Sequence, residues 1–435
     1  MAYPNRSHGI SEGAGTSRHL FELLTRYLRE HLPAGGRWRS SSGCATGPAA
    51  PDWIDEPQNP WLEERFMRSA GWIGFAAISM LITAAIMPLG CSGMRGPEML
   101  VIAKQGNRPF GGVVVGDLTQ RAFACDHGYV DWQIPPNARE LPLLFVHASS
   151  KKTWETAFDG DRDGFIPIFL RRGYAIYTTD LPRTGQAGQG CAPSRYDPDE
   201  QWSIQTSVTN WRYGTWLPGE AAPTFYPGVQ FPTDDPAALD EFYRIQTPEF
   251  DAPENLAVET DALAVLLDEI GPAIMVTHSS TGIRGWIAAM KSNQAAAIVS
   301  YEPGDFVYPE GELPPPLPTA DGRMQSPGRE VPLEEFLALT RLPIQIVWGD
   351  YIPKVLDPSH IGPLATLDSR RRNVVRARLM VDAINRHGGD AQNLRLPDIG
   401  ITGNTHFPML DLNNVEIADV LSAFLEEKGL DERKR

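Results

Sequence analysis

Five short apolar runs, rich in β-branched and aromatic residues, constrain the fold of this chain more than any other feature. They are LLFVHA (143–148), YAIYTTDL (174–181), AIMVTHS (273–279), AAIVSYE (296–302) and IQIVWGD (344–350). Near-continuous apolar runs of this length are typical of strands that are buried on both faces of a parallel sheet. The runs therefore predict a mostly parallel sheet.

Segments with a helical pattern lie between and after these runs. Helices are predicted at 255–270, 281–290, 373–386 and 415–428. Earlier in the chain, GGVVVGDL and YVDWQIP predict two short antiparallel strands. Alternation of strands and helices over roughly 300 residues predicts one doubly wound α/β domain.

The alternation breaks between residues 185 and 254, a stretch that contains Trp202, Trp211, Trp216 and several prolines. This stretch is too long for an ordinary connection, so we predict a cap over the ends of the strands. A second irregular stretch, 309–328, is rich in proline and predicts an exposed loop.

The N-terminal part of the chain has a different character. Residues 1–66 are rich in Gly, Ser, Arg and Pro and are predicted not to fold alone. The run from Ser69 to Gly90 contains no charged residue and is long enough to span a bilayer. Basic residues precede the run and small residues close it, which predicts a signal peptide or a membrane anchor over residues 67–91.

This N-terminal segment has two interpretations. If Met67 is the true start, residues 1–66 are a mis-extension of the reading frame; otherwise they form a cytoplasmic tail held by a signal anchor. Cys91 resembles the lipid acceptor of a bacterial lipoprotein, although Pro88 stands where leucine is usual. Under both interpretations residues 92–435 are expected to be exported as a periplasmic, secreted or envelope-anchored domain.

Charge, cysteines and motifs argue against several classes of function. The formal net charge of −15 and the lack of a long basic stripe argue against a nucleic-acid partner. No CxxC pair, HExxH helix or GxGxxG turn is present, so neither a metal nor a cofactor is expected, and a dehydrogenase is disfavoured. In an exported chain Cys125 and Cys191 are a candidate pair, but their spacing gives no support for a disulfide.

A serine lies between a predicted strand and a predicted helix in AIMVTHSSTGIRGWIAAM. A nucleophile held on such a turn projects its hydroxyl above the sheet, and this makes Ser279 a candidate. Thr277 and Thr281 stand where the usual G-x-S-x-G motif has glycine. Ser280 is a rival, and a serine at this place is often only a helix cap.

A serine nucleophile needs a histidine base, and an acid between the two in chain order. His406 follows the predicted last strand, LRLPDI, and precedes the last helix, which makes it the preferred base. We expect His278 to point away from the serine and His147 to shape the oxyanion loop. For the acid, position alone narrowly favours Asp350 over Glu302, with Asp305 a weaker third.

Four blocks of the chain, HASSKKTWET, THSSTG, IVSYEPGD and TGNTHFPMLD, resemble in this order a divergent branch of bacterial carboxylesterases with the α/β-hydrolase fold. The resemblance implies Ser279 as nucleophile, His406 as base and Glu302 as acid, and so favours Glu302 over Asp350. It also implies export. The branch has His-Gly and paired cysteines in its oxyanion loop, where this chain has 147–150, His-Ala-Ser-Ser.

Together these observations predict hydrolysis of a small-molecule carboxylic ester through an acyl-enzyme. The backbone N–H of Ser280 and one from Ala148 or Ser149 would stabilise the oxyanion. Aromatic residues of the predicted cap indicate an apolar or aromatic group on the substrate. The alternatives are an amidase, lactonase or thioesterase with the same residues, or a non-catalytic binding lipoprotein of this fold.

Overall fold

The computed structural model describes residues 26, 99–147, 150–155, 157–158, 162–192, 203–247 and 254–433. Ser92–Arg435 forms a compact unit separate from Met1–Cys91. The predictions for residues 1–66, apart from Arg26, and for 67–91 therefore lie outside the described residues. Within the described ranges, no helix combines the length and the apolar character needed to cross a membrane.

An eight-stranded sheet forms the centre of the larger unit, in the order β1-β2-β4-β3-β7-β8-β13-β14. Only β2 runs against the others, because it pairs antiparallel with both β1 and β4. The strands are β1 (Lys104–Asp117), β2 (Arg121–Ile134), β3 (Leu143–His147), β4 (Ile176–Asp180), β7 (Ala273–His278), β8 (Ala295–Tyr301), β13 (Pro343–Trp348) and β14 (Asp390–Arg395). Each of the five apolar runs forms a strand, and the predicted doubly wound, mostly parallel sheet is confirmed.

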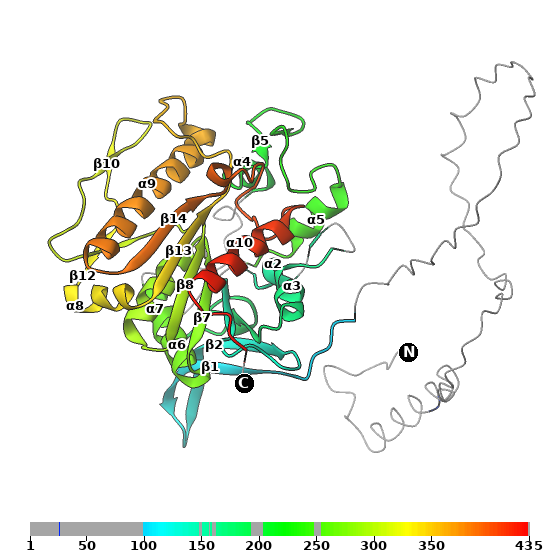
Figure 1. The fold of residues 1–435 in the computed structure, drawn as a ribbon, viewed down its shortest axis with the longest axis vertical. Helices are drawn as coiled ribbons and strands as arrows, with labels where there is room; N and C mark the ends of the chain where they lie inside the picture. The colour runs from blue at the N-terminus through cyan, green and yellow to red at the C-terminus, as the bar shows by residue number, and fades with distance from the viewer. Residues whose placement is uncertain are drawn as a thin grey trace, which may run out of the picture. The chain divides into compact units, whose positions relative to one another are not determined.

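Successive residues of the central strands belong to two hydrophobic cores, one on each face of the sheet. In β3, Leu143 and Phe145 join one core, and Leu144 and Val146 join the other. This is the side-chain alternation of a strand that is covered on both faces. Helices α3 (Phe165–Arg171) and α10 (Asn414–Glu427) cover the first face, and α6 (Asn255–Ile270), α7 (Thr281–Lys291) and α9 (Ala365–Arg386) cover the second (Figure 1).

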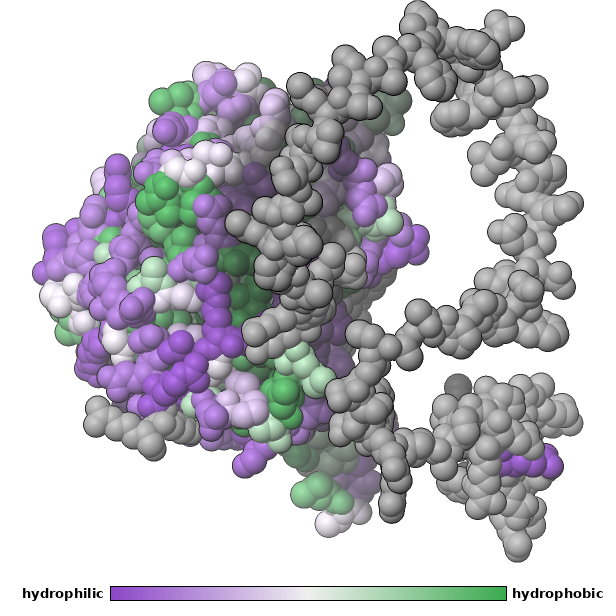
Figure 2. All heavy atoms as spheres, turned by 45° about the vertical axis from the view of Figure 1, so that its right-hand side comes forward, coloured by the Kyte–Doolittle hydropathy of each residue, from purple (hydrophilic) through white to green (hydrophobic). Residues whose placement is uncertain are grey.

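The remaining elements are short and lie in the connections. They are α2 (Lys152–Glu155), β9 (Val307–Pro309), β10 (Leu317–Pro318), β11 (Met324–Gln325), β12 (Arg329–Val331), α8 (Leu333–Phe336) and the 3₁₀ turns η1 (Gly185–Ala187), η3 (Leu337–Arg341), η4 (Gly362–Leu364) and η5 (Leu396–Ile399). The predicted loop over 309–328 is mostly exposed and contains the β10–β11 pair. On the face drawn in Figure 2, the coloured surface is mostly hydrophilic.

The two antiparallel strands are longer than predicted, with 14 residues each, and two further elements differ in their bounds. Helix α9 begins at Ala365, eight residues before the predicted start at 373, because its first turns bury charged side chains instead of an apolar stripe. Asp368 accepts hydrogen bonds from Arg371 and Arg372 there. The last strand is Asp390–Arg395, not LRLPDI, since residues 396–399 form η5 and only the first two residues of that run belong to β14.

Residues 185–254, here called the inserted segment, are described at 185–192, 203–247 and 254. They contain α4 (Ile204–Asn210), β5 (Gly214–Thr215), β6 (Thr224–Phe225) and α5 (Pro236–Arg244). Tyr213, Phe231 and Phe242 are buried against one another, with ring centroids 4.4–5.9 Å apart. These aromatic side chains form the interior of the segment.

A disulfide links the sheet to the inserted segment. Cys125 of β2 and Cys191 are bonded, with an S–S distance of 2.02 Å. Beside it, Arg183 donates from Nε and Nη2 to the two oxygens of Asp126, at 2.8 and 3.0 Å. The sequence offered this pair of cysteines only as a candidate.

Candidate active site

Ser279 occupies a sharp turn between β7 and α7. Its φ of 53° lies in the left-handed region, which residues other than glycine adopt rarely and at some cost in energy. Hydrogen bonds hold the turn: Ser279 N–H donates to Tyr301 O at 2.9 Å, and Ser279 O accepts from Gly282 and Gly304 at 3.1 Å each. A strained serine at the end of a central strand has the geometry of a nucleophile elbow.

The two threonines that depart from G-x-S-x-G fit this turn. Gly285 of α7 faces Thr277, and a Cβ at residue 285 would lie 2.9 Å from Thr277 Cγ2. The hydroxyl of Thr281 accepts from His278 N–H at 3.0 Å and has two carbonyl oxygens within reach of its proton, His278 O at 2.8 Å and Val146 O at 2.9 Å. The bulk of one threonine is therefore matched by a glycine on the following helix, and the other threonine ties β7 to β3.

His406 lies between the serine and a glutamate. Its Nε2 is 3.0 Å from Ser279 Oγ, and its Nδ1 is 3.1 Å from Glu302 Oε2. A carboxylate can only accept, so Nδ1 carries the proton and Nε2 is left to accept from the serine hydroxyl. The backbone N–H of His406 donates to Trp211 O at 2.9 Å, which ties the base to the inserted segment.

Glu302 is fully buried and has its acceptor sites occupied. Arg212 donates to both carboxylate oxygens, at 2.8 and 2.5 Å, and Gly349 N–H donates to Oε1 at 2.7 Å. Asp350 instead accepts from Gly403 N–H at 3.0 Å and from Tyr351 N–H at 2.7 Å. The structure therefore brings Glu302, and not Asp350, to the imidazole, and Asp350 positions the loop that carries the base.

The imidazole of His406 is held in its neutral form. Burial lowers the pKa of His406 well below its usual range, and the nearby cations Arg370 and Arg212 lower it further. A neutral imidazole is the form that can accept a proton from serine. Asp411 holds the same loop by accepting from the backbone N–H and the hydroxyl of Thr405, at 2.8 Å each.

Two further histidines form a chain of hydrogen bonds behind the site. Ser150 N–H donates to His147 Nδ1 at 2.9 Å, His147 Nε2 lies 3.2 Å from His278 Nδ1, and His278 Nε2 lies 2.8 Å from His406 O. A backbone N–H can only donate and a carbonyl can only accept, so each neutral ring has one consistent tautomer.

Both rings of this chain are neutral as well as buried. Burial lowers the pKa of His147 to about 3 and that of His278 well below its usual range. The chain links the start of the 147–150 loop to the backbone of His406. The His278 ring is directed toward His147 and the carbonyl of His406, and His147 accepts from the N–H of Ser150.

The predicted oxyanion donors are described in part. Ser280 is the N-cap residue of α7 and makes no side-chain cap hydrogen bond. The first N–H groups of a helix have no partner within the helix, so this end of α7 suits a developing negative charge. Ala148 and Ser149 lie outside the described residues.

Arg212, Arg370 and Asp411 are the members of this site that the sequence alone did not reveal. The partners of Arg212 and Arg370 are far away along the chain: Glu302 is 90 residues from Arg212, and Asn210 is 160 residues from Arg370. Isolated charged residues form no periodic pattern that would mark them in the sequence.

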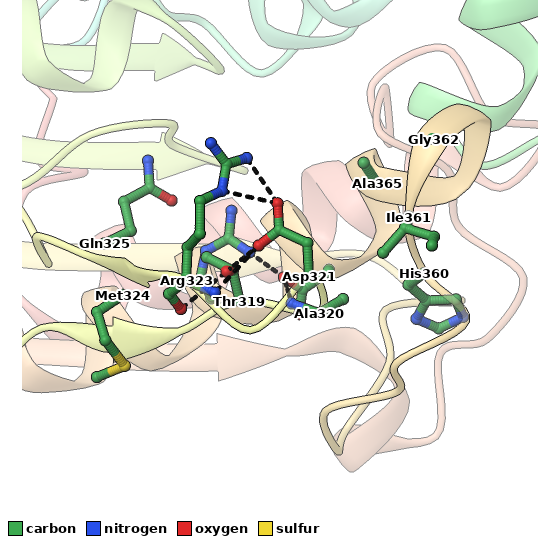
Figure 3. A pocket seen from close by; sticks show the side chains of 12 residues that line it. Thr319, Ala320, Asp321, Arg323, Met324, Gln325, His360, Ile361, Gly362 and Ala365 are labelled. Carbon is green, nitrogen blue, oxygen red and sulfur yellow. Dashed lines mark hydrogen bonds and ion pairs between the residues drawn. The ribbon is translucent and has the colours of Figure 1, made fainter.

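A separate surface pocket of about 480 Å³ lies beside the β10–β11 pair, η4 and the start of α9 (Figure 3). Its charged residues bind one another: Asp321 pairs with Arg323, and Asp368 pairs with Arg372. None of its lining residues is hydrogen-bonded to Ser279, His406 or Glu302. In the ranges that the structure describes, no group of three or more His, Cys, Asp or Glu residues could hold a metal ion.

Comparison with known proteins agrees with this architecture. No protein-family model matches the chain. The chain is 28% identical over 322 residues to a probable secreted lipase, phiG, of Fungal sp. (strain ATCC 74256), covering 69% of this chain and 86% of the lipase. The solved structure of a novel bacterial esterase is 23% identical with a TM-score of 0.57, covering 76% of this chain and 98% of the esterase. The chain has the α/β-hydrolase fold.

Proposed function

We propose that this protein is a carboxylic ester hydrolase with Ser279 as nucleophile, His406 as base and Glu302 as acid. The observation that carries the proposal is the continuous set of contacts from Ser279 Oγ to His406 Nε2, at 3.0 Å, and from His406 Nδ1 to Glu302 Oε2, at 3.1 Å. This order of groups is the one that acyl transfer by serine requires. The likeness to a secreted lipase supports the same activity.

The first half of the reaction forms the acyl-enzyme. Ser279 Oγ attacks the ester carbonyl while His406 Nε2 takes the hydroxyl proton, and Glu302 stabilises the imidazolium that forms. The N–H of Ser280, with one from Ala148 or Ser149, binds the oxyanion; each such donor contributes roughly 3–4 kcal/mol to the transition state. The tetrahedral intermediate then collapses, and His406 returns the proton to the departing alkoxide.

The second half repeats the same roles with water. His406 Nε2 takes a proton from water, the hydroxide attacks the acyl carbonyl, and the acid product leaves as Ser279 regains its proton. Arg212 holds Glu302 in place throughout, because it binds both carboxylate oxygens.

We further propose that residues 92–435 act outside the cytoplasm, exported by a signal peptide or anchor over residues 67–91. The Cys125–Cys191 disulfide supports this, since disulfides persist in oxidising compartments. The apolar or aromatic group predicted for the substrate stays a prediction, because the aromatic side chains of the inserted segment mostly pack against one another.

A substrate panel with two serine variants tests the activity. Wild type should hydrolyse short-chain and aromatic nitrophenyl esters and react with a fluorophosphonate. Ser279→Ala should lower kcat by about 10⁴-fold or more and abolish labelling. Ser280→Ala is the matched control, since it keeps the backbone N–H and should retain most activity. Folded wild type that neither turns over nor labels would refute the proposal, and faster turnover of amides, lactones or thioesters would reassign the substrate.

A further inference from the structure

Arg370 is a second buried arginine beside the proposed reacting groups. It lies on α9, with 9% of its surface exposed. Its Nη2 donates to Asn210 Oδ1 at 3.1 Å. Among the residues that the structure describes, this is its one hydrogen bond, and it has no ion pair. Burial lowers its pKa to about 10, so the side chain is still charged at neutral pH.

The nearby carboxylate cannot take Arg370 as a direct partner. Glu302 already accepts two hydrogen bonds from Arg212, one from Gly349 N–H and one from His406. Two carboxylate oxygens have about four acceptor sites, and all four are used. Two arginines thus share one carboxylate, and the buried group of Arg212, Arg370 and Glu302 carries one positive charge in excess.

An unpaired buried charge is costly unless something compensates it. A neutral side chain at 370 would avoid this cost, and a hydrogen bond to an asparagine does not require a guanidinium. Arg212, by contrast, donates from Nη1 and Nη2 to Glu302 and from Nε to Asp350 O, and this contrast indicates that the charge of Arg370 serves a partner other than the protein.

The position of Arg370 places this excess charge at the site. Its partner Asn210 directly precedes Trp211, whose carbonyl accepts from His406 N–H at 2.9 Å, and Arg212, which binds the acid. The inserted segment therefore holds Arg370, the base and the acid through three consecutive residues. A guanidinium with N–H donors that no described residue uses is suited, at this place, to a planar, doubly accepting anion.

We propose that Arg370 binds a carboxylate of the substrate, so that the preferred substrates are esters that carry a free carboxylate, such as half-esters of dicarboxylic acids. This rests on the proposed esterase function and specifies its substrate class. The carboxylate of the substrate would neutralise the excess positive charge of the group formed by Arg212, Arg370 and Glu302.

The test compares two esters with the same acyl length, nitrophenyl butyrate and nitrophenyl hemisuccinate, in the full chain. The quantity measured is the ratio of their kcat/KM values, hemisuccinate over butyrate. In Arg370→Met this ratio should fall roughly tenfold to hundredfold, the range expected when a hydrogen bond to a charged group is lost. An effect through the pKa of His406, or through general loss of fold, would change both esters alike and leave the ratio unchanged.

A second variant keeps the arginine and supplies it with a partner. Asn210→Asp places a carboxylate where Arg370 now meets an amide, so it should lower the same ratio by competing with the substrate, even if Arg370→Met does not fold. Asp240→Asn, at an exposed ion pair of the inserted segment, is the matched control and should keep the wild-type ratio.

The possible outcomes separate the two proposals. A wild-type ratio that is unchanged in folded Arg370→Met, or in Asn210→Asp, would overturn the role of Arg370 while esterase activity stands. Absence of any Ser279-dependent turnover in the wild type would instead refute the esterase function itself.

Discussion

The sheet and the inserted segment contribute to the candidate site in different ways. The ends of β7 and β8 carry Ser279 and Glu302, and the loop after β14 carries His406. The inserted segment supplies none of these groups. Its residues 210–212 instead bind Arg370, the base and the acid. The inserted segment, predicted as a cap, therefore also holds the base and the acid in place. The proposed chemistry depends on both regions.

Removing the charge of Arg212 should show this dependence most strongly. Arg212→Met would leave Glu302 buried without its cation, so the free energy of unfolding should fall by about 3–5 kcal/mol, with near-complete loss of ester hydrolysis. Urea denaturation and kcat/KM measure the two effects.

An exposed ion pair in the same segment is the control for this prediction. Arg244 pairs with Asp240, and the two side chains are 76% and 60% exposed. Arg244→Met should therefore cost less than about 1 kcal/mol. If Arg212→Met and Arg244→Met lowered the free energy of unfolding equally, the inserted segment would have no structural role at the site.

The disulfide tests how firmly the two regions are joined. Cys125 and Cys191 close a separation of 66 residues between the sheet and the inserted segment. Replacing both by serine should lower the free energy of unfolding by roughly 2–4 kcal/mol. Thermal unfolding of wild type with and without reductant gives the same comparison without mutation. Identical unfolding curves would show that the segment is held by its other contacts alone.

The histidine chain tests what the sheet adds beyond the reacting groups. His147→Asn keeps an acceptor for Ser150 N–H but is too short to reach His278, whereas His147→Ala loses both contacts. If the chain positions the base, both variants should lower kcat, by up to about 100-fold, with little change in KM. A wild-type kcat in His147→Asn would show that His147 does not position the base and acts only on the loop that contains Ser150.

The last expected effect concerns the loop that carries the base. Burial raises the pKa of Asp411 to about 7, from the value of 3.8 for an exposed group. Between these values the folded protein holds a proton that the unfolded chain has lost. The free energy of unfolding should therefore decrease as pH rises from about 4 to 7, by up to about 1.4 kcal/mol per pH unit.

Comparison with Asp411→Asn isolates this contribution. The buried histidines act in the opposite direction, because their lowered pKa values make the unfolded chain bind protons first as pH falls below about 6.5. The difference in free energy of unfolding between wild type and Asp411→Asn should therefore change with pH only between about pH 4 and 7. Parallel curves across that range would contradict a raised pKa for Asp411.

Much of the fold was predictable because apolar burial leaves a local pattern. The strands are covered on both faces, so each one appears in the sequence as an apolar run, and α6 was predicted with the bounds that it has. The start of α9 and the strand β14 were missed or misplaced. Both are mostly polar, so no apolar period marks them in the sequence, even where the buried pairs are local, as between Asp368 and Arg371.

The candidate site was predictable to a different degree. Strand ends and chain order suggested Ser279 and His406, and the structure brings them within 3.0 Å. The acid could not be chosen from position along the chain, because Glu302 and Asp350 both follow central strands. The structure distinguishes them, since only Glu302 contacts the imidazole. The place of Arg370 beside the site could not be predicted from the sequence, because it depends on how α9 packs against α4.

The bond from His406 N–H to the carbonyl of Trp211 has a consequence for how a substrate enters. A second tie runs from Gln230 N–H to Gly403 O, at 2.8 Å. If the inserted segment swung away as a rigid lid, it would release the base from Trp211 and the acid from Arg212 in the same movement. A molecule without these ties would therefore lack the contacts that hold the base and the acid, so the segment has to keep the position described here for the reaction to proceed.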